Sequence, residues 1–209
     1  MLKYSKKYVI LYIRGGLMIT IRNKSKINTE MINRIIDLLP GDYLKMDVEV
    51  RIYGSVFSLL KTIFSKELSI KLLDLYKIID LNIFGFYSNK NNIIEVYLFN
   101  IPLKNRKQNF VVNLMHELRH KYQDCYLQEL YNTDYYIKHK NTKTEHLKYA
   151  NNKIEIDAEN FAFKFYNKNR NEIDKILEIT KDYKLRKKLQ DFENKSISFK
   201  RLYFEYIFR

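Results

Sequence analysis

The sequence predicts an α+β fold in which a small mixed or antiparallel sheet packs on helices. Short runs rich in β-branched and aromatic residues occur in the first half of the chain, and longer segments with helical periodicity follow. Of 209 residues, 46% are hydrophobic, and only 5 are Gly and 2 are Pro, so the chain can build a core and offers few sites for a flexible linker. We therefore expect one domain over residues 1–209.

The first expected elements are two antiparallel strands near the N-terminus. Segments 8–13 and 17–21 are rich in β-branched and aromatic residues. Gly15 and Gly16 lie between them and can adopt the positive φ angles of a tight turn. This pattern predicts a hairpin.

Residues 1–80 form an N-terminal portion of unassigned role. After the first hairpin, the pattern in this portion predicts helices around one strand. Asn28 can cap a helix that ends before the Pro-Gly pair at 40–41. Segment 48–52 alternates apolar and polar residues, as a half-buried strand does. Segment 55–81 has apolar residues at helical spacing and predicts two helices or one broken helix.

Residues 83–166 combine an expected hairpin with long helices. Segments 83–87 and 93–99 predict a second hairpin, and segment 106–130 predicts a long helix. One buried stripe of that helix, at steps of four and three, comprises Val111, Met115, Leu118, Tyr122 and Cys125. We expect Cys125 to lie in the core because no activating motif surrounds it.

Two further helices are expected after the core helix. Segment 154–166 carries Ala158 and Ala162 on one face, and the amphipathic segment 173–189 belongs to a helical C-terminal portion, residues 167–209. The aromatic-rich segment 197–208 is ambiguous between helix and strand.

The pattern that points to chemistry is HELRH at 116–120. Residues four apart share a helix face, so His116 and His120 can bind one ion, and zinc suits two imidazoles. Glu117 lies about 100° round the helix and can act as general base for the water at the metal's open side. A chance match arises in roughly one such chain in a hundred or fewer. The apolar periodicity around the motif, without Pro or Gly, favours the metal site instead.

A catalytic zinc normally has a third protein ligand, and segment 155–162, EIDAENFA, offers one. Glu155 and Glu159 share a helix face, so Glu155 can bind the metal while Glu159 accepts a hydrogen bond from a ligand histidine. The small Ala158 and Ala162 would let the two helices approach closely. Without HELRH, the same segment would more simply be a solvated acidic helix face.

Together, HELRH and EIDAENFA resemble the gluzincin metallopeptidases, in particular the small ImmA/IrrE-like members, over residues 83–166. The resemblance implies a zincin-like fold with residues 83–166 as its catalytic core, and Zn²⁺ held by His116, His120 and Glu155. It also implies that strand 93–99 borders the substrate cleft, and that Glu159 stands where the family usually has Asp or Asn.

Other ligand sets and catalytic groups stay open. His139 and His146 are rival third ligands if the site has three histidines, as in SprT-like proteases. A metzincin is disfavoured because position 123 is Gln and position 126 is Tyr. The oxyanion that forms during hydrolysis needs a hydrogen-bond donor besides the metal. The sequence does not distinguish between five candidates: Tyr131, Tyr135, Tyr136, His139 and His146.

Net charge and composition limit the kinds of partner that we expect. The formal charge of +14 is compatible with nucleic acid, but the basic residues are scattered. A single cysteine gives no sign of an oxidising compartment, and no run approaches the roughly 20 apolar residues of a membrane span. We expect a cytoplasmic zinc peptidase acting on a protein or peptide. The alternative is a basic nucleic-acid-associated protein, either an SprT-like protease or a non-catalytic binding protein with a structural metal.

Overall fold

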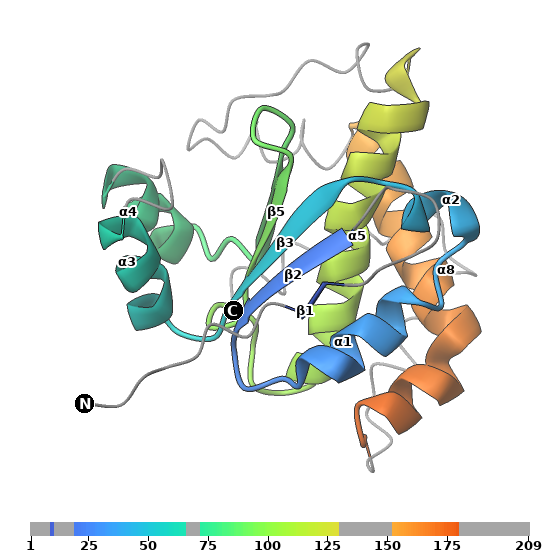
Figure 1. The fold of residues 1–209 in the computed structure, drawn as a ribbon, viewed down its shortest axis with the longest axis horizontal. Coiled ribbons are helices and arrows are strands. Elements are labelled where there is room, and N and C mark those ends of the chain that lie inside the picture. The colour runs from blue at the N-terminus through green and yellow to red at the C-terminus, as the bar shows by residue number, and fades with distance from the viewer. Residues whose placement is uncertain (1–8, 11–18, 66–71, 130–151, 180–209) are drawn as a thin grey trace.

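A computed structural model describes residues 9–10, 19–65, 72–129 and 152–179 (Figure 1). Its elements, in chain order, are β1 (Val9–Ile10), β2 (Ile19–Lys24), α1 (Thr29–Ile36), α2 (Gly41–Leu44), β3 (Val48–Tyr53), α3 (Val56–Phe64), α4 (Leu72–Asp80), β4 (Gly85–Ser88), β5 (Ile93–Tyr97), α5 (Arg106–Tyr126) and α8 (Lys153–Ile176). The α+β class expected from the sequence is confirmed. The expected segment 197–208 lies outside the described residues.

The sheet is small and mixed, with strand order β1-β2-β3-β5-β4. β2, β3 and β5 are parallel, while β1 pairs antiparallel with β2 and β4 pairs antiparallel with β5. Both expected antiparallel strand pairs are therefore present. The expectation of a half-buried β3 was wrong, because this strand is central and both of its faces are covered. Val50 is buried on one face, and Arg51 and Tyr53 are buried on the other.

Helices cover the two faces of the sheet. α3 and α4 lie on one side, where Leu59 and Leu75 pack with Tyr53 and Tyr97. α5 and α8 lie on the other side (Figure 1), in the main core. That core also takes residues from α1, β2, β3 and β5, so the N-terminal portion supplies central strands to the same packed unit as the helices of the expected metal site.

Local signals explain where several helices begin. The side chain of Asn28 accepts a hydrogen bond from the backbone N–H of Glu30, as expected for a cap of α1. Ser55 and Ser58 form a capping box at the start of α3. The Asn152 side chain accepts from the backbone N–H of Ile154 at the start of α8. This last cap fixes where the helix that carries Glu155 begins.

α8 departs from the expected helix pair 154–166 and 173–189. It runs unbroken from Lys153 to Ile176, because residues 167–172 contain no Pro or Gly and the buried face continues through Ile173. Leu177 caps it, and residues 180–189 lie outside the described part of the chain.

The last turn of α5 also departs from expectation. Cys125 is exposed rather than in the core. The C-terminal end of α5 extends beyond the sheet (Figure 1), and Tyr126 beside Cys125 is exposed as well. The buried stripe therefore ends before this turn, since periodicity alone does not say how far along a helix its neighbours reach.

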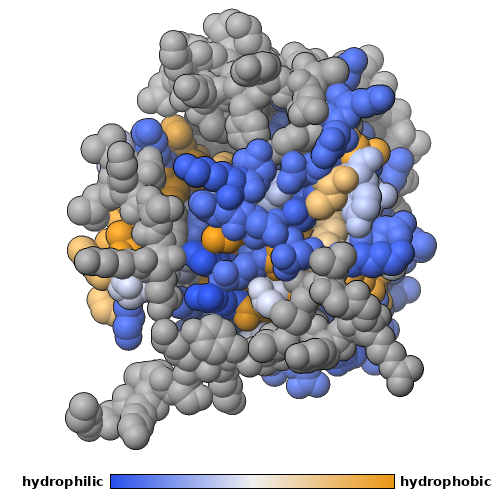
Figure 2. All heavy atoms as spheres, turned by 45° about the horizontal axis from the view of Figure 1, so that its top comes forward, coloured by the Kyte–Doolittle hydropathy of each residue, from blue (hydrophilic) through white to orange (hydrophobic). Residues whose placement is uncertain are grey.

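No helix in the described ranges combines the length and apolar character needed to cross a membrane. Among the residues coloured in Figure 2, hydrophilic side chains dominate the centre of this face, and apolar side chains gather at its left edge.

Candidate metal centre

The two histidines of HELRH lie one turn apart near the middle of α5, on the same face. Their Nε2 atoms are 3.0 Å apart, and the two rings meet edge to face with centroids 4.6 Å apart. The uninterrupted helix explains this geometry, because a spacing of four brings side chains together on consecutive turns. His116 and His120 thus direct the same ring atom to one point.

Glu155 reaches that point from the first turn of α8. Its Oε2 lies 3.2 Å from Nε2 of His116 and 3.4 Å from Nε2 of His120. The three side chains are only 15%, 12% and 16% exposed, in the order His116, His120, Glu155. The tertiary structure therefore brings together the three ligands predicted from two separate motifs.

The donor set fits a metal ion. Ligand atoms of His116, His120 and Glu155 all lie within 4.8 Å of one another. Oε2 of Glu155 is buried and accepts no hydrogen bond of good geometry from the described residues. A buried carboxylate oxygen normally has a partner, and a cation among the three atoms would be one. Two imidazoles and one carboxylate are a usual set for catalytic zinc, which keeps its remaining position open.

The charges of His120 and Glu155 shift each other's pKa in opposite directions. Burial acts to lower the pKa of His120, but the negative charge of Glu155 prevails and raises it to about 9. Burial acts in the opposite sense on Glu155, and the positive charge of His120 holds the pKa of this carboxyl well below its usual range. Protonation of His120 would therefore compete with binding of a metal ion at the same site.

Glu117 lies on α5 beside this centre and is 5% exposed. Burial raises its pKa, with a smaller contribution from Glu155. The charges of the two histidines and a hydrogen bond from the backbone N–H of Tyr87 oppose that rise. A buried carboxylate with a raised pKa, held against a strand, has the properties of a general base.

The strand beside Glu117 is β4. A Cβ placed on Gly85 would lie 3.0 Å from Cγ and from Oε1 of Glu117. That strand 93–99 borders a substrate cleft stays a prediction; β5 lies inside the sheet, and β4 is the edge strand beside Glu117. Gly85 was not predicted as a site residue. The signal in the sequence was a glycine within a strand pattern, which often marks a close approach.

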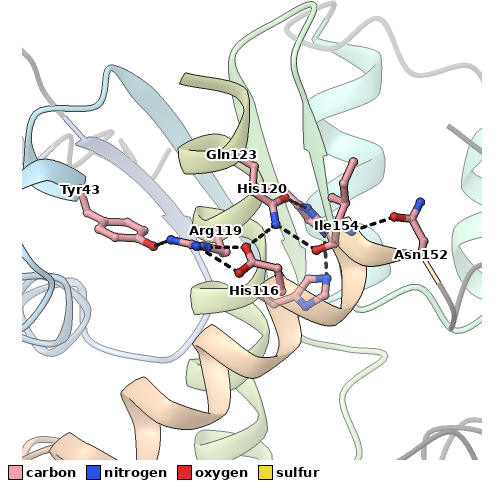
Figure 3. Close-up of polar contacts among 8 residues, drawn as sticks. Tyr43, His116, Arg119, His120, Gln123, Asn152 and Ile154 are labelled. Carbon is pink, nitrogen blue, oxygen red and sulfur yellow. Dashed lines mark hydrogen bonds and ion pairs between the residues drawn. The ribbon is translucent and has the colours of Figure 1, made fainter. Parts of the chain in front are cut away.

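A hydrogen-bonded chain behind His120 was not predicted either (Figure 3). Gln123 contacts Nδ1 of His120 through Oε1 at 2.9 Å and donates from Nε2 to Asp157 at 2.7 Å. Arg119 donates two hydrogen bonds to Asp157 and one to the hydroxyl of Tyr43. The only sequence signal was position: Arg119 is within HELRH, Gln123 is one turn after His120, and Asp157 follows Glu155 by two.

Glu159 was expected to accept a hydrogen bond from a ligand histidine. In the structure, the side chain that contacts the free ring nitrogen of His120 is Gln123. Glu159 as a partner of His116 stays a prediction. Burial, and then repulsion by Glu155, raises the pKa of Glu159 to about 8, so it carries a proton more readily than an exposed glutamate does.

The remaining expected residues lie outside the described part of the chain: Tyr131, Tyr135, Tyr136, His139 and His146. The rival third ligands and the candidate oxyanion donors are therefore among the residues of which the structure says nothing. Among the described residues, the group able to bind a metal consists of His116, His120 and Glu155. Comparisons with protein-family models, with curated proteins and with solved structures found no match.

Proposed function

We propose that the protein is a zinc-dependent peptidase. The observation that carries the proposal is the convergence of Nε2 of His116, Nε2 of His120 and Oε2 of Glu155, with buried Glu117 beside them. A metal site alone can be structural. The carboxylate of Glu117 lies next to the ligands but is not itself a ligand. This favours a catalytic site, because such a carboxylate can accept a proton from water during hydrolysis.

Each residue of the site would have a role that follows from its chemistry. His116, His120 and Glu155 would hold the ion, which when bound polarises a carbonyl and acidifies water. Glu117 would accept a proton from the attacking water and pass it to the leaving amine. Its raised pKa brings it closer to the pH at which it must both accept and release that proton.

The edge of the sheet favours an extended peptide as substrate. β4 pairs with β5 on one side, and no strand of the described ranges pairs with it on the other. An extended peptide can add to such an edge through main-chain hydrogen bonds. Because Gly85 of β4 lies against Glu117, a peptide on that edge would pass the proposed base. This arrangement supports peptide hydrolysis over hydrolysis of a small molecule.

The first test is the zinc content of purified protein, measured by elemental analysis. We expect about one zinc per chain in the wild type and loss of zinc in His116→Ala, His120→Ala and Glu155→Ala. An Asp42→Ala variant is the control, because Asp42 is an exposed carboxylate far in sequence from the site. A wild type that binds no zinc even after reconstitution would refute the metal site.

The second test separates catalysis from metal binding. Glu117→Gln should retain zinc and lose cleavage of a mixed peptide library, followed by mass spectrometry. Glu129→Gln, on an exposed glutamate, should cleave as the wild type does. Equal cleavage by Glu117→Gln and wild type would contradict the role of Glu117. A wild type that binds zinc and cleaves no peptide in the library would count against the peptidase proposal.

A further inference from the structure

Gln123 occupies an unusual position for an amide side chain. It lies on α5 one turn after His120, and it is fully buried at 0% exposure. Its Oε1 lies 2.9 Å from Nδ1 of His120. A buried amide needs partners for its oxygen and for its nitrogen, and this contact accounts for the oxygen.

The other contacts of Gln123 fix which way the amide points. Its Nε2 lies 2.9 Å from the carbonyl oxygen of Ile154 and 2.7 Å from Oδ2 of Asp157. A carbonyl oxygen and a carboxylate only accept hydrogen bonds, so the NH₂ group must face them. Oε1 therefore faces His120, and an acceptor there requires a hydrogen on Nδ1. In the neutral imidazole, Nε2 then carries the lone pair that a metal needs.

Asp157 is itself held firmly. Arg119 donates to it from Nε at 2.7 Å and from Nη2 at 3.1 Å, a two-point contact that fixes the carboxylate plane. The third arm of the guanidinium donates to Tyr43 at 2.6 Å. The guanidinium also lies over the rings of Tyr122 and Phe161, at 4.8 and 5.2 Å from their centroids. The contacts thus run from α2 through α5 and α8 to the imidazole of His120.

From this geometry we propose that Gln123 is a positioning residue that selects the Nδ1–H tautomer of His120, and that Asp157, held by Arg119, keeps the amide of Gln123 in the required orientation. The inference rests on the proposed function, since the tautomer matters only if Nε2 binds a metal. It assigns a role to Arg119, which lies between the two histidines of HELRH, and to Asp157, which follows Glu155 by two positions.

The test measures zinc affinity and the tautomer separately. Zinc affinity would be measured by competition with a chelator, and the tautomer from ¹⁵N shifts of the His120 ring in metal-free protein at a pH where the ring is neutral. In Gln123→Leu we expect zinc affinity to fall about 10- to 100-fold and His120 to leave the Nδ1–H form. Gln128→Leu, at an exposed glutamine, is the matched control.

Asp157→Asn tests whether Asp157 keeps the amide of Gln123 in its orientation. It also provides a second variant if Gln123→Leu does not fold. It keeps the shape of the side chain but removes the charge that accepts from Arg119 and Gln123, and we expect about a tenfold loss of zinc affinity. A change in thermal stability alone, with zinc affinity and tautomer as in the wild type, would make these residues merely structural and overturn the inference. If the wild type binds no zinc, the proposed function fails, while an Nε2–H tautomer of His120 in wild type would independently refute the role of Gln123.

Discussion

Gly85 of β4 and Glu117 of α5 pack so closely that a Cβ on Gly85 would lie 3.0 Å from both Cγ and Oε1 of the glutamate. The same Cβ would lie 2.6 Å from Oδ1 of Asn113, one turn before Glu117. Distances this short mean that a side chain on Gly85 must displace its neighbours. The absence of a side chain at this strand position therefore lets the proposed base lie directly against the sheet.

Gly85→Ala should lower peptide cleavage without removing zinc. The added methyl group would displace Glu117 and Asn113, whereas the three metal ligands are elsewhere on α5 and α8. We expect kcat/KM to fall about 10- to 100-fold, as misplaced catalytic groups commonly cause. Gly41→Ala is the control, because a Cβ there meets nothing within 4 Å. Unchanged cleavage by Gly85→Ala would show that Glu117 has room to move or is not the base.

Zinc affinity should depend on pH through His120. The pKa of this residue in the metal-free protein is raised to about 9, since the negative charge of Glu155 outweighs the opposing effect of burial. Below pH 9, zinc binding must release the proton on Nε2. We expect apparent affinity to rise about tenfold per pH unit from pH 7 to 9 and then level off. Calorimetry in buffers of different ionisation enthalpy would count the released protons, and a pH-independent affinity would refute the effect.

The stability of metal-free protein should fall as pH rises from about 6.5 to about 9. The folded-state pKa of His120 lies above its ordinary value of 6.5, so its contribution is complete below pH 6.5 and is lost through about 9. The pKa of Glu155 is lowered from 4.5, so its contribution is complete above pH 4.5 and is lost in acid. We expect a loss of roughly 1–3 kcal/mol between pH 6 and pH 9.

Urea unfolding of wild type and Glu155→Gln measures this loss. The amide keeps the shape of the side chain but removes the charge that stabilises protonated His120, so the difference between the two proteins should shrink toward pH 9. Saturating zinc should reverse the loss in wild type, since the ion replaces the proton. A difference between wild type and Glu155→Gln that stays constant from pH 6 to 9 would contradict the proposed pairing.

Ala162→Leu should destabilise the protein and weaken zinc binding together. Ala158 and Ala162 are fully buried on α8, in the helix pair that brings Glu155 to the histidines. A larger side chain would force α8 away from its neighbours, at a cost of about 1–3 kcal/mol. Chemical unfolding and zinc titration would measure both effects. Asn167→Leu, at an exposed position of the same helix, should change neither, and an Ala162→Leu protein with wild-type zinc affinity would argue against this packing as the source of the geometry.

Much of the fold follows from local sequence. The cap at Asn28, the strand pairs and the two helices of segment 55–81 were all predictable, because turn residues and hydrophobic periodicity act over a few positions. The continuity of α8 was not, since no single residue in 167–172 forces or forbids a helix. The exposure of Cys125 depends on how far neighbouring elements extend along α5, which periodicity does not encode.

At the metal centre too, some features follow from the sequence and others only from the tertiary structure. The sequence by itself determined that His116 and His120 share a helix face, because the turn of the α-helix brings residues four apart together regardless of what surrounds them. Glu155 was identified through a second motif, but only the packing of α8 on α5 places its oxygen within 3.4 Å of both rings across 34 intervening residues. Gly85, Gln123 and Asp157 were decided by the tertiary structure alone. Their roles depend on contacts between separate elements, and such contacts leave no fixed spacing in the sequence.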